Sequence, residues 1–173
     1  HISHFQIRNR GTVCGSIAHA DPSAELPLCL LALGGEISLR SRNRSRVVAA
    51  KEFFLGTFLT AREPDELIES VSFPLRKPNQ QFAFDEFSMR HGDYAIVAVA
   101  AAADEKGVVL TVGGVEYRPV SQYWRGVSGS DIDSLLNDFS LSLDAQDDQH
   151  ASAIYRKHLV RVLGKKVIER VLS

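Results

Sequence analysis

The chain has 173 residues, of which 45% are hydrophobic and 24% charged, and its formal net charge is −1. This composition is typical of a globular protein that is large enough to bury a core. It argues against a surface for nucleic acid or anionic membranes, because such surfaces need a basic excess. The arginine run SLRSRNRSR at residues 38–46 instead predicts an exposed strand edge or hairpin turn, since no aromatic side chains interleave with it.

The number of cysteines and the hydropathy of the chain bear on the cellular location that we expect. Cys14 and Cys29 are too few for a disulfide framework, and Cys29 lies in the apolar run LPLCLLAL, where we expect it to be buried. No apolar stretch reaches the length of a membrane span, and no signal peptide opens the chain. We therefore expect no membrane span, no nucleic-acid partner and a cytoplasmic location.

The first half of the chain predicts short helices and strands. A helical turn over residues 1–9 is followed by a glycine-punctuated turn at 11–16. The next helix begins near Ser23, with Asp21 or Ser23 as its N-cap, and Gly34-Gly35 ends it. Alternating patterns and turn signals then predict a strand pair, a short helix and one more strand, over residues 36–42, 45–50, 51–54 and 66–73.

Residues 74–80, PLRKPNQ, predict a boundary between two domains, 1–76 and 77–173, because two prolines interrupt all periodicity. The second domain is expected to hold three antiparallel strands with two helices on one face, over 82–90, 94–104, 107–120, 131–143 and 151–172. We expect Ser130 to cap the first of these helices. The predicted core of this α+β layer consists of Val97, Val99, Val109, Leu159 and Leu163.

Four segments resemble one known family in chain order. They are RNRGTVCGSIAHADPSAELP, FFLGTFLTAREPDELIESVSFP, FDEFSMRHGDYAIVAVAAA and DDQHASAIYRKHLVRVLGKKVIERVL, which begin at residues 8, 53, 84 and 147. Together they resemble the FAD-binding medium subunits of molybdenum hydroxylases, such as aerobic carbon monoxide dehydrogenase and the xanthine dehydrogenases. The resemblance covers nearly the whole chain and is weakest over about residues 113–145.

The resemblance implies a fold for this chain, and it also implies that residues 1–173 alone bind FAD poorly. Residues 1–76 are similar to the second subdomain of a two-subdomain FAD-binding (PCMH-type) domain, and residues 77–173 to the C-terminal domain of these flavoproteins. In the family an upstream flavin subdomain, with its own glycine-rich loop, precedes this point. Because charge-assisted hydrogen bonds are worth roughly 1.5–3 kcal/mol each, we expect residues 1–173 without that loop to hold FAD weakly or not at all.

A flavin-binding loop is implied at Thr12, Val13, Cys14, Gly15 and Ser16, which match the segment that wraps the flavin diphosphate. Backbone N–H groups reach phosphate oxygens only where no bulky side chain intervenes, and Gly15 meets that need. Thr12 and Ser16 add hydroxyl donors. Cys14 replaces the first of the two glycines usual in the family. By itself, the same stretch also fits a tight turn without a ligand.

Four further residues are implied as cofactor contacts, each with a structural alternative. Glu25 matches an acidic residue that bonds the sugar-like part of the cofactor, and Asp21 either shares that task or caps a helix. Tyr94 matches a residue that covers one face of the isoalloxazine, or is a core aromatic of its strand. Ile68 matches an apolar contact to the adenine or flavin edge, and fits a core position equally well.

The implied function is that of an oxidoreductase subunit that carries electrons. In the resembling enzymes, electrons pass from a molybdenum cofactor in a large subunit through [2Fe-2S] clusters in a small subunit to FAD, and then to NAD, a quinone or oxygen. This chain would hold FAD, with no catalytic residue or metal site of its own and no activity as an isolated piece. The alternatives are a structural fragment that binds no flavin, and another flavoprotein such as a cell-wall reductase or oxidase.

Overall fold

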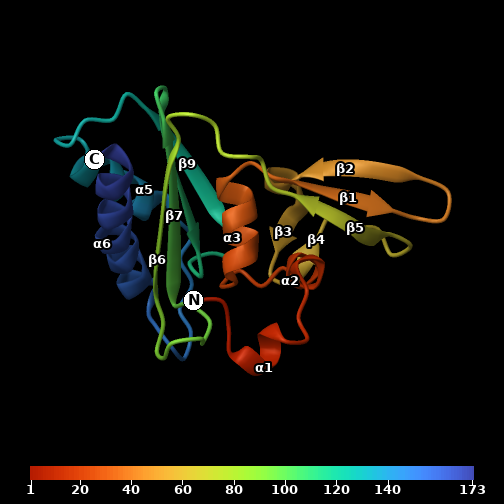
Figure 1. Ribbon diagram of the computed structural model, residues 1–173. Coiled ribbons are helices and arrows are strands. Elements are labelled where there is room, and N and C mark those ends of the chain that lie inside the picture. Colours follow the sequence, from red (N-terminus) through yellow and green to blue (C-terminus); the bar gives the residue numbers. More distant parts are fainter.

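The computed structural model describes residues 1–173 as two larger antiparallel sheets and a small two-stranded one, with helices between and beside them (Figure 1). The helices are α1 Phe5–Arg8, α2 Val13–His19, α3 Glu25–Ala32, α4 Ala50–Phe53, α5 Ile132–Ser142 and α6 Ala153–Leu172. The strands are β1 Glu36–Arg40, β2 Ser45–Ala49, β3 Phe54–Gly56, β4 Leu59–Thr60, β5 Leu67–Ser72, β6 Gln81–Phe87, β7 Val97–Asp104, β8 Gly107–Gly113 and β9 Val120–Arg125. None of the helices combines the length and the apolar character needed to cross a bilayer.

The first sheet has the strand order β2-β1-β5, and all its pairs are antiparallel. Ile37 lies opposite Val48 on one side and Val71 on the other, which buries the apolar face of the predicted strand pair. The arginine run forms the hairpin between β1 and β2, as expected. The small β3–β4 hairpin was not predicted, because strands of three and two residues are too short to carry a periodic signal.

The second sheet has four strands in the order β6-β7-β8-β9, so the prediction of three strands is wrong. The expected third strand ends at Gly113, and Gly114, with a φ of +74°, reverses the chain. Residues 120–125 then return as β9, with Trp124 opposite Val108. The sequence VSQYWR alternates too weakly to indicate a strand, because most of its side chains are exposed at the sheet edge.

Helices cover both faces of this second sheet, contrary to the expectation of one face. Helices α5 and α6 enclose the main core, in which Val97, Val99, Leu159 and Leu163 are buried as predicted. Val109 is not part of it, because successive strand residues point to opposite faces and Val108 and Leu110 take the core side. Both α5 and α6 begin slightly later than predicted, at N-caps Asp131 and Ser152.

The opposite face of the second sheet packs against α3, which lies between the two sheets (Figure 1). Leu28 and Ala32 of α3 contact Ala98 and Ala100 of β7, whose small side chains let the helix approach closely. Leu30 of the same helix belongs to the core under the first sheet. An apolar helix with two buried sides therefore joins the two halves of the chain.

A buried carboxylate holds the first sheet to the loop before β5. The Glu66 side chain is 0% exposed and accepts two hydrogen bonds from Arg46, each 2.8 Å long, and one from the Glu63 amide. These bonds, led by those from Arg46, lower the pKa of Glu66 to about 2 from an ordinary value of 4.5. Since the folded pKa lies below the unfolded one, this stabilisation is present above pH 4.5 and is lost as the pH falls toward 2.

Glu66→Gln is therefore expected to lower the melting temperature at neutral pH and to make stability less dependent on pH between about 4.5 and 2. Thermal unfolding followed across this pH range measures both effects. Glu69→Gln is the matched control, because Glu69 forms its 2.7 Å ion pair with Arg40 at the surface, where such pairs contribute little. Equal behaviour of the two variants would contradict the assignment.

Candidate flavin site between the two sheets

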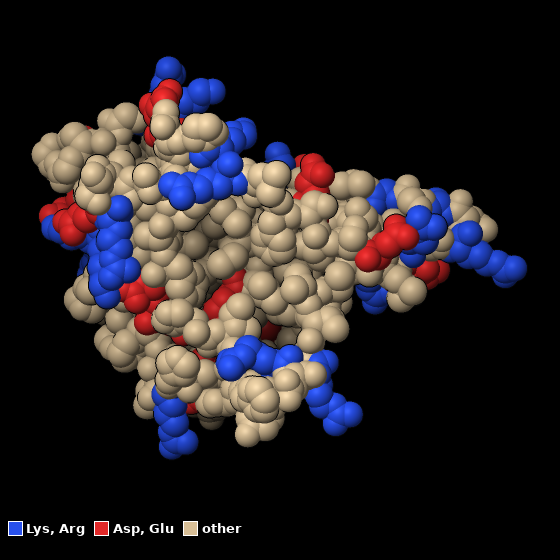
Figure 2. Space-filling model, in the orientation of Figure 1, with Lys and Arg blue, Asp and Glu red and all other residues tan.

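A cavity of about 980 Å³ lies between the two halves of the chain and is the larger of two pockets described here. Five segments line it: α1 with the loop that follows, the first turn of α2, residues 23–26, residues 89–96 and residues 148–156. Figure 2 shows a hollow in this part of the surface, with acidic side chains recessed inside it. A volume of this size is suited to a ligand of cofactor dimensions.

The segment predicted as a loop, residues 12–16, is instead the N-cap and first turn of α2. Thr12 caps the helix, and its Oγ1 accepts a 2.9 Å hydrogen bond from the Gly15 amide. The amides before Gly15 have no partner within the helix, so they are available to a ligand. Ile17 is fully buried and anchors this short helix in the core of the first half. The helix N-terminus is thereby fixed at the cavity wall.

Gly15 keeps that wall free of side chains. A Cβ placed on Gly15 would lie 2.9 Å from Thr12 Oγ1, which is closer than real Cβ contacts. Any larger residue would therefore disturb the cap and narrow the approach to the backbone. Thr12, Val13 and Ser16 line the cavity beside it, whereas Cys14 does not.

Glu25 supplies a buried carboxyl to the cavity from the first turn of α3. It is 7% exposed, and no side chain forms an ion pair with it. Its pKa is raised, first because burial desolvates the carboxyl and then because Glu86 and Asp21 carry like charges nearby. Ionisation of this carboxyl is thus disfavoured relative to that of a free glutamate.

Tyr94 forms part of another wall, just before β7. Its side chain is 58% exposed, so it is not the core aromatic of the structural alternative. Burial of the phenol, together with the charges of Asp21 and Glu25, raises its pKa above the ordinary value of 10.0. The preceding Gly92 has a φ of +92° and packs against the His4 ring, which sets the direction in which the chain enters this wall.

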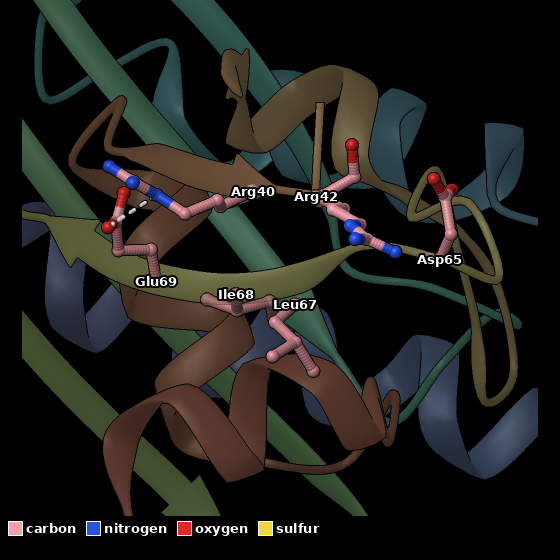
Figure 3. Close-up of a pocket in the computed structure, with 7 residues that line it drawn as sticks. Arg40, Arg42, Asp65, Leu67, Ile68 and Glu69 are labelled. Atoms are coloured by element: carbon pink, nitrogen blue, oxygen red, sulfur yellow. Dashed lines mark ion pairs between the residues drawn. The ribbon is translucent and has the colours of Figure 1, made fainter. Parts of the chain in front are cut away.

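Two other predicted residues lie outside the cavity. Asp21 does not cap α3, whose N-cap is Ala24; its Oδ1 instead accepts a 2.8 Å hydrogen bond from the Ser23 amide. Ile68 lies on β5 and lines a separate pocket of about 430 Å³ (Figure 3). The Arg40–Glu69 ion pair borders that second pocket (Figure 3).

Cationic residues that sequence reasoning did not single out also line the cavity: Arg8, Arg10 and Arg156. Arg8 is held near the N-terminal segment by hydrogen bonds of 2.9 and 2.6 Å to the carbonyls of Ile2 and Ser3. Arg8 and Arg10 beside a capped helix N-terminus favour an anionic ligand group, whereas Arg156 is paired with Asp148. Arg8 and Arg10 directly precede the glycine-punctuated motif. A search for charged residues beside that motif would have found them.

Comparison with known proteins relates the chain to a family of flavoproteins. Residues 1–76 match the family described as the FAD binding domain in molybdopterin dehydrogenase. The chain is 36% identical to the 6-hydroxypseudooxynicotine dehydrogenase complex subunit alpha of Paenarthrobacter nicotinovorans, across 99% of this chain and 62% of the relative. It is 37% identical to the nicotine 6-hydroxylase medium subunit of the same organism, across 97% and 63%.

The fold is that of a solved structure as well. Carbon monoxide dehydrogenase from Hydrogenophaga pseudoflava, in a form that lacks the Mo-pyranopterin moiety of its cofactor, superposes with a TM-score of 0.91 at 21% identity. The superposition covers 99% of this chain and 64% of that one. The chain thus spans less than two thirds of the length of the relatives it matches. Residues 1–76 thus match an FAD-binding domain of molybdopterin dehydrogenases, and the chain as a whole is similar to subunits of such dehydrogenases, including a medium subunit.

Proposed function

We propose that this chain holds FAD in an electron-transfer subunit of a cytoplasmic molybdenum-containing hydroxylase or dehydrogenase. The observation that carries the proposal is the 980 Å³ cavity, on which the first turn of α2, Glu25 and Tyr94 converge. Part of the cavity wall lies within the matched FAD-binding domain, which we take as the second flavin subdomain, residues 1–76. Residues 77–173 would form the C-terminal domain and provide the opposite wall.

The residues that line the cavity fit FAD in chemistry. The free amides at the start of α2, the Thr12 and Ser16 hydroxyls, and Arg8 and Arg10 suit a diphosphate. The buried Glu25 carboxyl suits the hydroxyl groups of a sugar-like chain. Tyr94 offers an exposed aromatic ring to a flat ring system. When bound, FAD would accept electrons and pass them on.

The protein residues would act by binding and orientation. The rigid first turn of α2 would fix one end of the cofactor, because Thr12 and Ile17 hold that helix in place. Glu25 would hold hydroxyl groups of the cofactor through hydrogen bonds at its carboxyl. Tyr94 would restrict the access of an electron acceptor to the ring. We extend the proposal to Asp21, whose charge acts on Glu25, as an outer contact of the cofactor, and leave out Ile68, which lines the separate pocket.

The partners proposed from the family are a small [2Fe-2S] subunit and a large subunit with the molybdenum cofactor. The electron acceptor would be NAD, a quinone or oxygen. The hydroxylated substrate would be selected in the large subunit, so the residues of this chain do not define it.

Affinity purification of the tagged protein from its native organism tests the proposal. We expect recovery of a small iron–sulfur protein and a large molybdenum protein, with FAD released on denaturation. Addition of the substrate of the complex should bleach the flavin absorption. Recovery of the same complex without flavin would instead favour a structural fragment, and recovery of neither partner would contradict the assignment to such an enzyme.

A further inference from the structure

Arg156 occupies an unusual position in the first turn of α6. The residue is 5% exposed, yet it lines the cavity. One terminal nitrogen, Nη1, donates to the carbonyl oxygens of Ile96 and Gly114, and the other lies 2.6 Å from Asp148 Oδ2. Its Nε is buried without a hydrogen-bond partner. A single guanidinium therefore joins three segments that are distant in sequence.

Stability alone gives little reason for an arginine at this place. A cation in the first turn of a helix faces the positive end of the helix dipole. A buried ion pair often contributes no more than well-packed apolar residues of similar volume, and here one donor is also left unpaired. What a guanidinium provides and an apolar side chain does not is a fixed direction toward several oxygen atoms.

Each of the three contacts of Arg156 connects it to a segment that forms or supports a wall of the cavity. Ile96 itself lines the cavity, two residues after Tyr94. The Gly114 amide donates a 2.8 Å hydrogen bond to the carbonyl of Pro22, just before the residues that lead into Glu25. Asp148 also accepts hydrogen bonds from the amides of His150 and Ala151, so it orders the rim of the cavity.

We propose that Arg156 is a positioning residue of the cavity, which holds the Tyr94 wall, the segment before Glu25 and the Asp148 rim in register with one another. It acts through backbone carbonyls and Asp148 and need not touch a ligand. The link to flavin binding rests on the proposed function, whereas the positioning role rests on the three contacts of Arg156 alone. The C-terminal helix thereby controls the shape of a site that begins in the N-terminal half.

Arg156→Met and Arg156→Lys test this role. Methionine removes all three contacts. Lysine keeps the positive charge, but its single ammonium group cannot contact the three partners as the planar guanidinium does. Leu136→Ala is the control for a general loss of stability, because Leu136 packs in the core under α6 and does not line the cavity. If Arg156→Met does not fold, Arg156→Lys carries the test.

Two measurements are made on each variant: the FAD dissociation constant of flavin-depleted protein, and amide hydrogen exchange over residues 94–97, 113–116 and 146–151. We expect Arg156→Met to raise the dissociation constant about tenfold or more and to speed exchange in all three segments, with Arg156→Lys in between. Leu136→Ala should leave the constant within about twofold and show no selective change in these segments.

If these three segments exchange in Arg156→Met at the wild-type rate, the positioning role is overturned. The same holds if Leu136→Ala accelerates exchange in the same segments selectively and to the same extent. Faster exchange with an unchanged dissociation constant would overturn its link to the flavin. If the wild-type protein binds no FAD even in the complex purified from its native organism, the proposed function fails, and the exchange comparison still decides whether Arg156 holds the cavity walls.

Discussion

Gly15→Val is expected to raise the FAD dissociation constant a hundredfold or more. Its Cβ would collide with Thr12 Oγ1, so the cap of α2 would be lost, and the branched side chain would stand between ligand and backbone. A lost cap costs about 1 kcal/mol and a lost charge-assisted hydrogen bond roughly 1.5–3 kcal/mol. Together these come to roughly 2.5–4 kcal/mol, a range that includes the roughly 2.8 kcal/mol of a hundredfold change.

Fluorescence quenching during titration of flavin-depleted protein with FAD measures this change. Ala18→Val provides the control, since it introduces the same side chain into α2 at an exposed position that does not line the cavity. The control should bind FAD as the wild type does. Unchanged affinity in Gly15→Val would mean that the start of α2 does not contact the cofactor.

Leu136→Ala is expected to lower the free energy of unfolding by roughly 2–5 kcal/mol. Leu136 is 1% exposed and fills the space left by Gly164, where an added Cβ would lie 2.8 Å from Leu136 Cδ2. Helix α6 lies this close to α5 because Gly164 has no side chain. A loss of this size is a large part of the roughly 5–15 kcal/mol that stabilises a typical domain.

Urea unfolding at equilibrium gives this free energy. The matched control is Leu141→Ala on the same helix, because Leu141 is 61% exposed and its truncation leaves no cavity. It should change stability by less than about 0.5 kcal/mol. Similar losses in both variants would show that the interface between α5 and α6 does not carry the stability assigned to it.

Sequence patterns were most informative where one period runs over many residues. The helical spacing of apolar residues over 151–172 predicted the buried Leu159 and Leu163 correctly, and Val97 and Val99 of the apolar strand β7 are buried as predicted. The second helix layer was missed because α3 is apolar on two sides, and its sequence does not reveal that each side faces a different sheet. The edge strand β9 was missed because exposed strand residues carry no strong alternation.

Sequence reasoning singled out several residues that the fold brings to one cavity. The resemblance indicated Thr12, Gly15, Glu25 and Tyr94, all of which line the cavity. It gave no sign of Arg156, whose partners Ile96 and Gly114 lie 60 and 42 residues away and bind through backbone oxygens. Backbone carbonyl groups occur at every residue, so the sequence does not indicate which of them Arg156 contacts. Only the fold shows this contact.

The crystal structure of the protein with FAD bound tests the central claim most directly. We expect the cofactor in the cavity between the two sheets, with its diphosphate at the first turn of α2. Its sugar-like hydroxyl groups should lie within hydrogen-bond distance of Glu25, and its ring system beside Tyr94. FAD bound elsewhere on the chain, with this cavity filled only by water, would contradict the assignment.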